Sequence, residues 1–208
     1  SIDHHGRYAF ANQPAVTQWN LARFADTLLP LIHSNKDTAI KIAEETINNF
    51  GPIYKNNWLK MMRKKLGLFR EEKEDETLIT ALLSWMHQKK ADYTNTFCSL
   101  INEDILKDKL FQDSTFHSWY KQWQKRLTLN KKPIKLSLNL MRTTNPLIIP
   151  RNYKVEEVLE AASIDGDLVP MHSLLAVLKK PYDDSSEIIA YQSPPAPSEH
   201  VYQTFCGT

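Results

Sequence analysis

The chain has 208 residues, of which 42% are hydrophobic and 24% are charged, and its formal net charge is +2. This composition excludes wholesale disorder, collagen and a coiled-coil rod, and the small charge gives no general attraction to nucleic acid or anionic lipid. The two cysteines, Cys98 and Cys206, are too few for a disulfide framework, so we expect a reducing, cytoplasmic compartment. No apolar run is long enough to cross a membrane. Because the sequence begins Ser-Ile-Asp without an initiator methionine, we expect a piece of a longer protein.

Three helices are predicted in the first third of the chain, after a loop over residues 1–12. From Pro14 onward, apolar residues recur at helical spacing and predict one amphipathic face, made of Val16, Trp19, Phe24, Leu28 and Ile32. Ser34 or Asn35 is expected to cap the second helix, which Gly51-Pro52 should break or kink. The third helix should stop at Gly67. The basic residues of 55–70 then form a solvated face, with nucleic-acid binding as the alternative.

The middle of the chain predicts further helices separated by polar segments. Residues 71–76 are acidic and are expected to form a solvated linker, after which Asp75 or Thr77 caps a helix. Asp92 should cap a shorter helix, another should start at Ser114, and a further segment is expected over residues 133–141. All five tryptophans lie on apolar stripes, and we predict that most of them are buried: 19, 58, 85, 119 and 123.

Residues 143–152 differ from the rest because two prolines in an apolar stretch exclude regular helix. The backbone groups of such a segment need partners. We expect Arg151 to bond backbone carbonyls or a carboxylate at helix ends, and Asn152 to cap the next helix. A place on a substrate surface is the alternative for this segment.

The C-terminal part predicts two more helices, over residues 155–162 and 168–178, and then an extended tail over 183–208 with at most a short strand at 188–191. The predicted fold is therefore an all-α domain over residues 1–182, an irregular arrangement of about seven to nine helices. Cys98 falls on an apolar stripe and should be buried and inert. Cys206 should be an exposed free thiol, with a redox or pairing role.

Chemical motifs are few. Asp3-His4-His5 contains metal-ligand types, but neighbouring residues of an extended chain rarely reach one ion, and a polar loop is the plainer interpretation. No nucleophile elbow, phosphate-binding loop or paired-cysteine motif is present in the sequence. Spacing alone predicts no metal site and no catalytic residue in this chain.

Four stretches together resemble one family. They are DHHGRYAFANQPAVTQWNLARFA at 3–25, KADYTNTF at 90–97, NPLIIPRNYKVEEVLEAA at 145–162 and YQTFCGT at 202–208. They are similar, in order and from end to end, to the selenoprotein O family, also called SelO or YdiU. The resemblance covers the whole chain but only the C-terminal part of a family member.

The resemblance implies a kinase-like pseudokinase fold that transfers AMP from ATP to Ser, Thr or Tyr hydroxyls of proteins, with Mg²⁺. The family's nucleotide-binding, catalytic and metal-binding residues would lie upstream of this chain, so the chain alone should be inactive and bind neither ATP nor Mg²⁺. Asp3, His5 and Arg7 match the segment after the metal-binding loop, and Cys206 matches the family's redox-active position. Its partner cysteine would also lie upstream, and Asn145, Arg151 and Asn152 belong to the most specific motif.

Two hypotheses follow for a bacterial, cytoplasmic protein of this kind. In the first, the chain is the helical C-terminal part of an adenylyltransferase whose partners are its missing kinase-like lobe and protein substrates. In the second, it is a non-enzymatic helical module that binds a protein or a nucleic acid. Neither hypothesis involves a membrane, and the balanced charge argues against nucleic acid as the partner.

Overall fold

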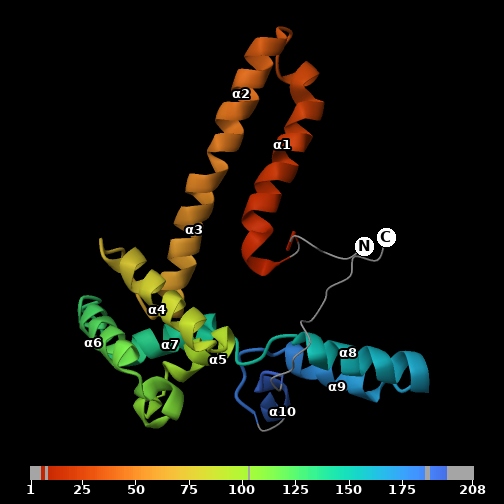
Figure 1. The fold of residues 1–208 in the computed structure, drawn as a ribbon. Helices are drawn as coiled ribbons and strands as arrows, with labels where there is room; N and C mark the ends of the chain where they lie inside the picture. The colour runs from red at the N-terminus through yellow and green to blue at the C-terminus, as the bar shows by residue number, and fades with distance from the viewer. Residues whose placement is uncertain (1–5, 8, 103, 186–187, 196–208) are drawn as a thin grey trace. The chain divides into compact units, whose positions relative to one another are not determined.

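A computed structural model describes residues 6–7, 9–102, 104–185 and 188–195. Over these residues the all-α prediction is confirmed, because the structure has nine α-helices of seven or more residues, a single-turn α10 and no strand (Figure 1). None of the described helices combines the length and apolar character that a membrane crossing requires. The described residues form two compact units, one up to Trp58 and one from Leu59 to residue 195. This division lies inside a helix, whereas the sequence places the end of the helical domain at residue 182.

The first unit contains α1 (Gln13–Ile32) and α2 (Lys36–Asn48), which lie side by side (Figure 1), preceded by the short η1 (Phe10–Asn12). Asn35 caps α2 as predicted, its Oδ1 accepting from the Thr38 N–H at 2.9 Å. The helical path is interrupted at Asn49, so that Gly51-Pro52 falls in the first turn of α3 (Phe50–Lys65), where the missing proline N–H leaves no bond unmade.

The predicted apolar face of α1 is only partly covered. Val16, Leu28 and Ile32 are half-buried, but the Trp19 and Phe24 side chains are 53% and 60% exposed. Among the described residues up to Trp58, Ala39 alone is fully buried. The periodicity therefore predicts the helices of this unit correctly, and the expected burial of their apolar faces is wrong.

The second unit contains the main core, formed by the end of α3 with α4 (Asp75–Lys89), α5 (Tyr93–Ser99), α6 (Ser114–Thr128) and α7 (Ile134–Thr144). Between α5 and α6 lie the short turns η2 (Ile105–Lys107) and η3 (Lys109–Gln112). Side chains with almost no exposure fill this core: Met62, Leu66, Ile79, Leu82, Trp85, Phe97, Phe116, Trp119, Trp123 and Met141. The prediction that most tryptophans are buried is confirmed by three of the five, while Trp58 is half-buried.

Gly67 ends α3 as predicted, with a left-handed φ of 71°. A Cβ at this position would lie 3.0 Å from the Ser137 carbonyl oxygen and 3.1 Å from the Met141 sulfur. The glycine therefore does two things: it allows the left-handed turn, and it lets α7 approach the end of α3 closely.

A smaller core lies among α8 (Asn152–Glu160), α9 (Val169–Leu178), α10 (Ile189–Gln192) and the residues just before α8, while the π-helical turn η4 (Ala161–Asp165) that follows α8 buries no side chain. Its buried side chains are Ile148, Val158, Leu174, Val177 and Ile188. The strand considered at 188–191 is wrong, since residues 189–192 form a helical turn. Ile188 and Tyr191, three residues apart, both pack on this core, which a helical turn permits and an extended strand does not. The extended tail is therefore not observed at residues 188–192, and residues 196–208 lie outside the described part.

Candidate functional site

Asn145 opens the 145–151 segment, the irregular stretch between α7 and α8, and it is 1% exposed. Its Nδ2 donates to the Lys65 carbonyl at 2.9 Å, and its Oδ1 accepts from the Lys65 Nζ at 3.0 Å. Lys65 is the last residue of α3, where backbone carbonyls lack partners within the helix. Asn145 thus satisfies a carbonyl at the end of a helix 80 residues away in the chain.

The side chains of Lys65 and Cys98 both hydrogen-bond to the 145–151 segment. The Lys65 Nζ lies 4.9 Å from the centroid of the Phe97 ring, and burial lowers the pKa of Lys65, opposed by the nearby Cys98. The Cys98 Sγ donates to the Pro146 carbonyl at 3.2 Å. Burial raises the pKa of the Cys98 thiol to about 11, with the charge of Lys65 acting in the opposite direction. Cys98 is half-buried rather than buried, and as a protonated thiol it is a weak nucleophile.

Arg151 closes the segment and binds two helix ends, as the sequence predicts. Its Nη1 and Nη2 donate to the two Asp92 carboxylate oxygens at 2.8 and 3.1 Å, and Nη2 also donates to the Gln192 carbonyl at 2.8 Å. Asp92 caps α5 by accepting from the Asn95 N–H at 2.8 Å. The guanidinium therefore connects the start of α5 to the end of α10, with Arg151 itself 8% exposed.

The ion pair between Arg151 and Asp92 also affects the pKa of Asp92. Burial alone would raise that pKa, but the hydrogen bonds from Arg151 and the backbone N–H groups of Asn95 and Thr94, together with the Arg151 charge, outweigh burial and lower it. The carboxylate is therefore ionised in the folded chain at neutral pH, and the pair is held by charge as well as by hydrogen bonds.

Asn152 does not cap α8, and this prediction is wrong. The N-cap is Arg151, whose backbone is extended and whose carbonyl already accepts from the Val155 N–H at 3.1 Å. Asn152 is consequently the first residue of the helix and is exposed. The helix begins one residue too early for the Asn152 side chain to reach the free N–H groups.

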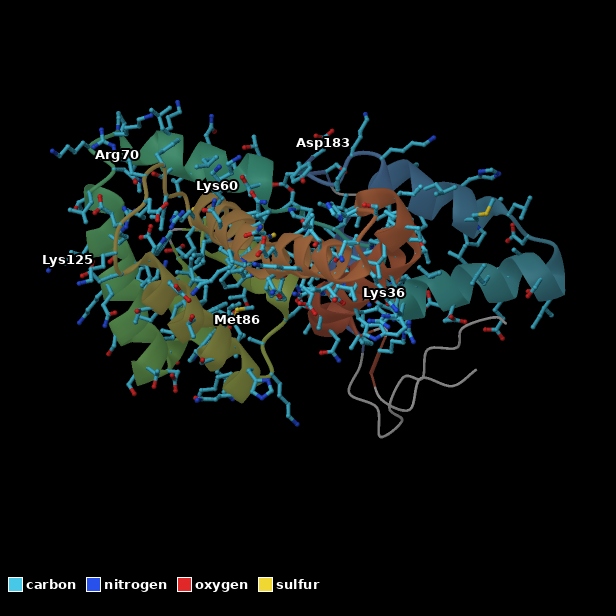
Figure 2. All side chains as sticks on the ribbon, turned by 90° about the horizontal axis from the view of Figure 1, so that it is seen from above. Lys36, Lys60, Arg70, Met86, Lys125 and Asp183 are labelled. Atoms are coloured by element: carbon cyan, nitrogen blue, oxygen red, sulfur yellow. The ribbon has the colours of Figure 1, made fainter. Side chains whose placement is uncertain are left out.

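The sequence analysis misses a buried ionic cluster, here called the Asp75 cluster. The Asp75 carboxylate, 0% exposed, accepts from the Arg63 Nε at 2.9 Å and the Arg126 Nε at 2.6 Å. Arg126 also donates to the Arg70 carbonyl at 2.7 Å. The predictions of a solvated linker and a solvated basic face are therefore wrong at Asp75 and Arg63, whereas Arg70 does lie at the surface (Figure 2). No local signal could identify the cluster, since its partners lie 12 and 51 residues from Asp75.

Of the remaining candidate site residues, one lies in the described part of the chain and three lie outside it. Arg7 is exposed and its guanidinium carbon lies 5.2 Å from the centroid of the Trp19 ring. Asp3, His5 and Cys206 lie outside the described residues. Within the described part no three His, Cys, Asp or Glu side chains come together in a way that could hold a metal ion. Asn145 and Arg151 therefore hold helix ends together, and this positioning is the chemistry that the described candidates perform.

Two kinds of comparison with known proteins point to the same family. A family model described as "Protein adenylyltransferase SelO" matches residues 1–179. Proteins named "Protein nucleotidyltransferase YdiU" are 52% identical in Nitrosococcus oceani, 51% in Alcanivorax borkumensis and 54% in Clostridium botulinum strain Hall, each over all 208 residues. The chain spans only 42%, 43% and 42% of the lengths of these relatives.

Proposed function

The chain belongs to the SelO family, and on this premise we propose that it is the C-terminal helical part of a protein adenylyltransferase. The observation that carries the proposal is the identity of about half of all positions to relatives named protein nucleotidyltransferases, sustained over the whole chain. The parent protein would transfer AMP from ATP to Ser, Thr or Tyr hydroxyls of proteins. This chain would support the part that performs the transfer.

The supporting role agrees with the uncovered apolar side chains of the first unit. Trp19, Phe24 and Leu31 are 53%, 60% and 83% exposed, and together they would be costly to leave in water. Phe24 and Leu31, seven residues apart on α1, share one face of the helix, and exposed apolar side chains that share a face are typical of an interaction site. The share of the relatives that the chain leaves unmatched supplies a candidate for the covering surface, namely the kinase-like lobe of the parent protein.

The proposed reaction is a nucleotidyl transfer. The substrate hydroxyl oxygen attacks the α-phosphorus of ATP, the bond from that phosphorus to the bridging α–β oxygen breaks, pyrophosphate leaves, and the hydroxyl proton passes to a base. ATP and Mg²⁺ would be bound by the kinase-like lobe, where Mg²⁺ supplies charge neutralisation. The described residues of this chain bring together no metal-ligand set, so we assign them no step of the transfer.

Cys206 would add redox control in the parent protein. The resemblance places its partner cysteine outside this chain, so we expect the Cys206 thiol to be free in the chain alone. In the parent, a bridge between the two sulfurs would tether the tail near residues 3–8 and slow substrate access. Reduction would then raise activity, and Cys206→Ala would behave as permanently reduced.

Transfer of AMP from α-labelled ATP to protein, measured for the parent protein and for this chain alone, tests the proposal. We expect label on protein with the parent and none with the chain, together with no saturable ATP binding by the chain in calorimetry. Micromolar ATP binding by the chain would contradict the proposal that ATP is bound by the kinase-like lobe and not by this chain. A correctly folded parent that transfers no AMP would favour the alternative, a helical module without enzymatic activity.

The supporting surface can be tested separately with Phe24→Asp in the parent protein. Phe24 is 60% exposed in the chain, so the change should leave the chain alone stable but lower the stability and activity of the parent. Ile164→Asp, at a position 72% exposed in the second unit, is the matched control. Equal effects of both changes on the parent would refute a specific contact at the α1 face.

A further inference from the structure

A cavity of about 390 Å³ lies in the second unit, between the end of α5, α6 and the start of α7. Its walls are mainly apolar and come from all three helical regions: Leu100, Ile101, Trp123, Leu127, Ile134 and Leu138. This volume is within the usual range for small-molecule sites, which are apolar hollows with a few well-placed polar groups. Neither Asn145 and Arg151 nor the Asp75 cluster lines it.

The aromatic wall of the cavity is held rigidly. The Trp123 indole N–H donates to the Leu66 carbonyl at 3.0 Å, so its polar atom is already satisfied. The Tyr120 ring lies 5.3 Å from the Trp123 ring at an interplanar angle of 53°. The Tyr120 ring also stacks on the buried Phe116 ring, with centroids 5.9 Å apart, which restrains the second ring as well. The half-buried Tyr120 ring, supported by the buried Trp123, therefore forms a fixed surface against which a flat or branched apolar group can pack without ordering that side chain.

The charge of the lining has one sign. Lys132 is the ionised residue that lines the cavity, and no acidic residue does. Its Nζ lies 4.3 Å from the centroid of the exposed Phe69 ring, and no ion pair to Lys132 is seen in the described part of the chain. Lysine carries its charge on a long flexible stem, so the ammonium can turn toward a ligand at the mouth. The amide side chains of Asn102 and Gln124 add further polar groups to the lining.

From this combination we infer that the cavity binds a small carboxylic acid with an aromatic or branched aliphatic body. The body packs against Tyr120 and Ile134, and the carboxylate lies toward Lys132. A cationic ligand would meet a like charge, and a strongly polar ligand would lose its own hydrogen bonds to water against walls that are mainly apolar. The inference concerns this chain alone and is independent of the nucleotide transfer proposed above.

Calorimetric titration of the whole chain with 2-naphthoate and with uncharged 2-naphthamide tests both halves of the inference. We expect one saturable site for the acid, and several-fold weaker binding of the amide. Lys132→Met should weaken binding of the acid several-fold and bring the two probes to equal affinity. Lys135→Met, which removes an exposed lysine that does not line the cavity, should change neither affinity.

A second pair of variants tests the location. Ile134→Trp fills the cavity from a side chain that is 55% exposed, and should weaken the acid at least tenfold. Leu136→Trp, on the same helix and 46% exposed but outside the lining, should leave it unchanged. Circular dichroism of each variant shows whether the fold is retained. The inference is overturned if 2-naphthoate shows no saturable binding, if the amide binds as tightly, or if Ile134→Trp and Leu136→Trp behave alike.

Discussion

The two units of the chain use similar sequence patterns and reach different degrees of burial. Both contain helices with apolar stripes, yet Ala39 is the single fully buried residue described up to Trp58, whereas the unit from Leu59 onward buries a large aromatic core. Trp19 and Trp85 mark the contrast, at 53% and 2% exposed. A stripe at helical spacing thus predicts which face of a helix is apolar, and it does not show whether this chain supplies the surface that covers it.

The largest expected effect is the difference between truncating these two tryptophans. Trp85 packs against Phe116 with ring centroids 4.7 Å apart, and Trp85→Ala should cost about 3–5 kcal/mol of unfolding free energy. Trp19→Ala should cost no more than about 1 kcal/mol, since the side chain is already 53% exposed and its ring contacts with Arg7 and Arg23 lie at the surface. Urea unfolding followed by circular dichroism measures both. Equal losses would show that the first unit also has a stabilising core.

A comparable contrast is expected between the ion pairs of the two units. Asp75→Ala removes the carboxylate that Arg126 pairs with and leaves Arg63 with the exposed Glu71. Two guanidinium groups only 6% and 7% exposed then lose their buried partner, so the change should cost about 3–5 kcal/mol. Asp26→Ala breaks the exposed Arg23–Asp26 pair on α1 and should cost less than about 1 kcal/mol. The same unfolding measurement compares them. A small loss for Asp75→Ala would mean that water reaches the two guanidinium groups.

A smaller effect is expected from Arg151→Lys. Lysine keeps the charge but cannot donate to both Asp92 oxygens and the Gln192 carbonyl at once, so we expect a loss of about 1.5–3 kcal/mol. Arg142→Lys, at an exposed position on α7, is the control and should have little effect. If Arg151→Lys leaves the stability unchanged but lowers activity of the parent protein, the segment belongs to a substrate surface instead.

The stabilisation of the folded chain by the Arg151–Asp92 ion pair should depend on pH, because it requires the ionised Asp92 carboxylate. Its pKa is lowered in the folded chain from the ordinary value of 3.8, so the stabilisation is complete above 3.8 and is lost as the pH falls toward the lower folded-state pKa. The difference in unfolding free energy between the original chain and Asp92→Asn should therefore be constant from pH 5 to 7 and shrink below about pH 4. A difference that does not change over pH 3–7 would contradict the Arg151–Asp92 pairing.

The smallest effect concerns the two thiols. With its pKa raised to about 11, Cys98 should react slowly with a thiol reagent at pH 8, and its rate should rise roughly tenfold per pH unit toward pH 10. Cys206 should react quickly, so Cys98→Ser should leave the fast phase and remove the slow one. If mass spectrometry instead finds a Cys98–Cys206 disulfide, the bond is a structural cross-link within this chain, and the proposal of a redox switch is wrong.

Much of the local structure could be predicted because it depends on neighbouring residues. Asn35 and Asp92 cap α2 and α5 through hydrogen bonds three residues away, and Gly67 stops α3 through its own backbone freedom. The type of partner that Arg151 binds could be predicted, because the polar groups of an irregular apolar segment need hydrogen-bond partners. Its actual partners were not predictable, since Asp92 and Gln192 lie 59 and 41 residues away in the chain.

By itself, the sequence determined the helical class, the positions of most helix starts and stops, and the family. Each of these depends on spacing within a few residues or on motifs kept in order along the chain. The tertiary structure alone decided that Asp75 is buried between two arginines, that Ile188 begins a helical turn on a small core, and that Trp19 is uncovered. Burial depends on which distant surface arrives at a side chain, and no pattern within one helix specifies that surface.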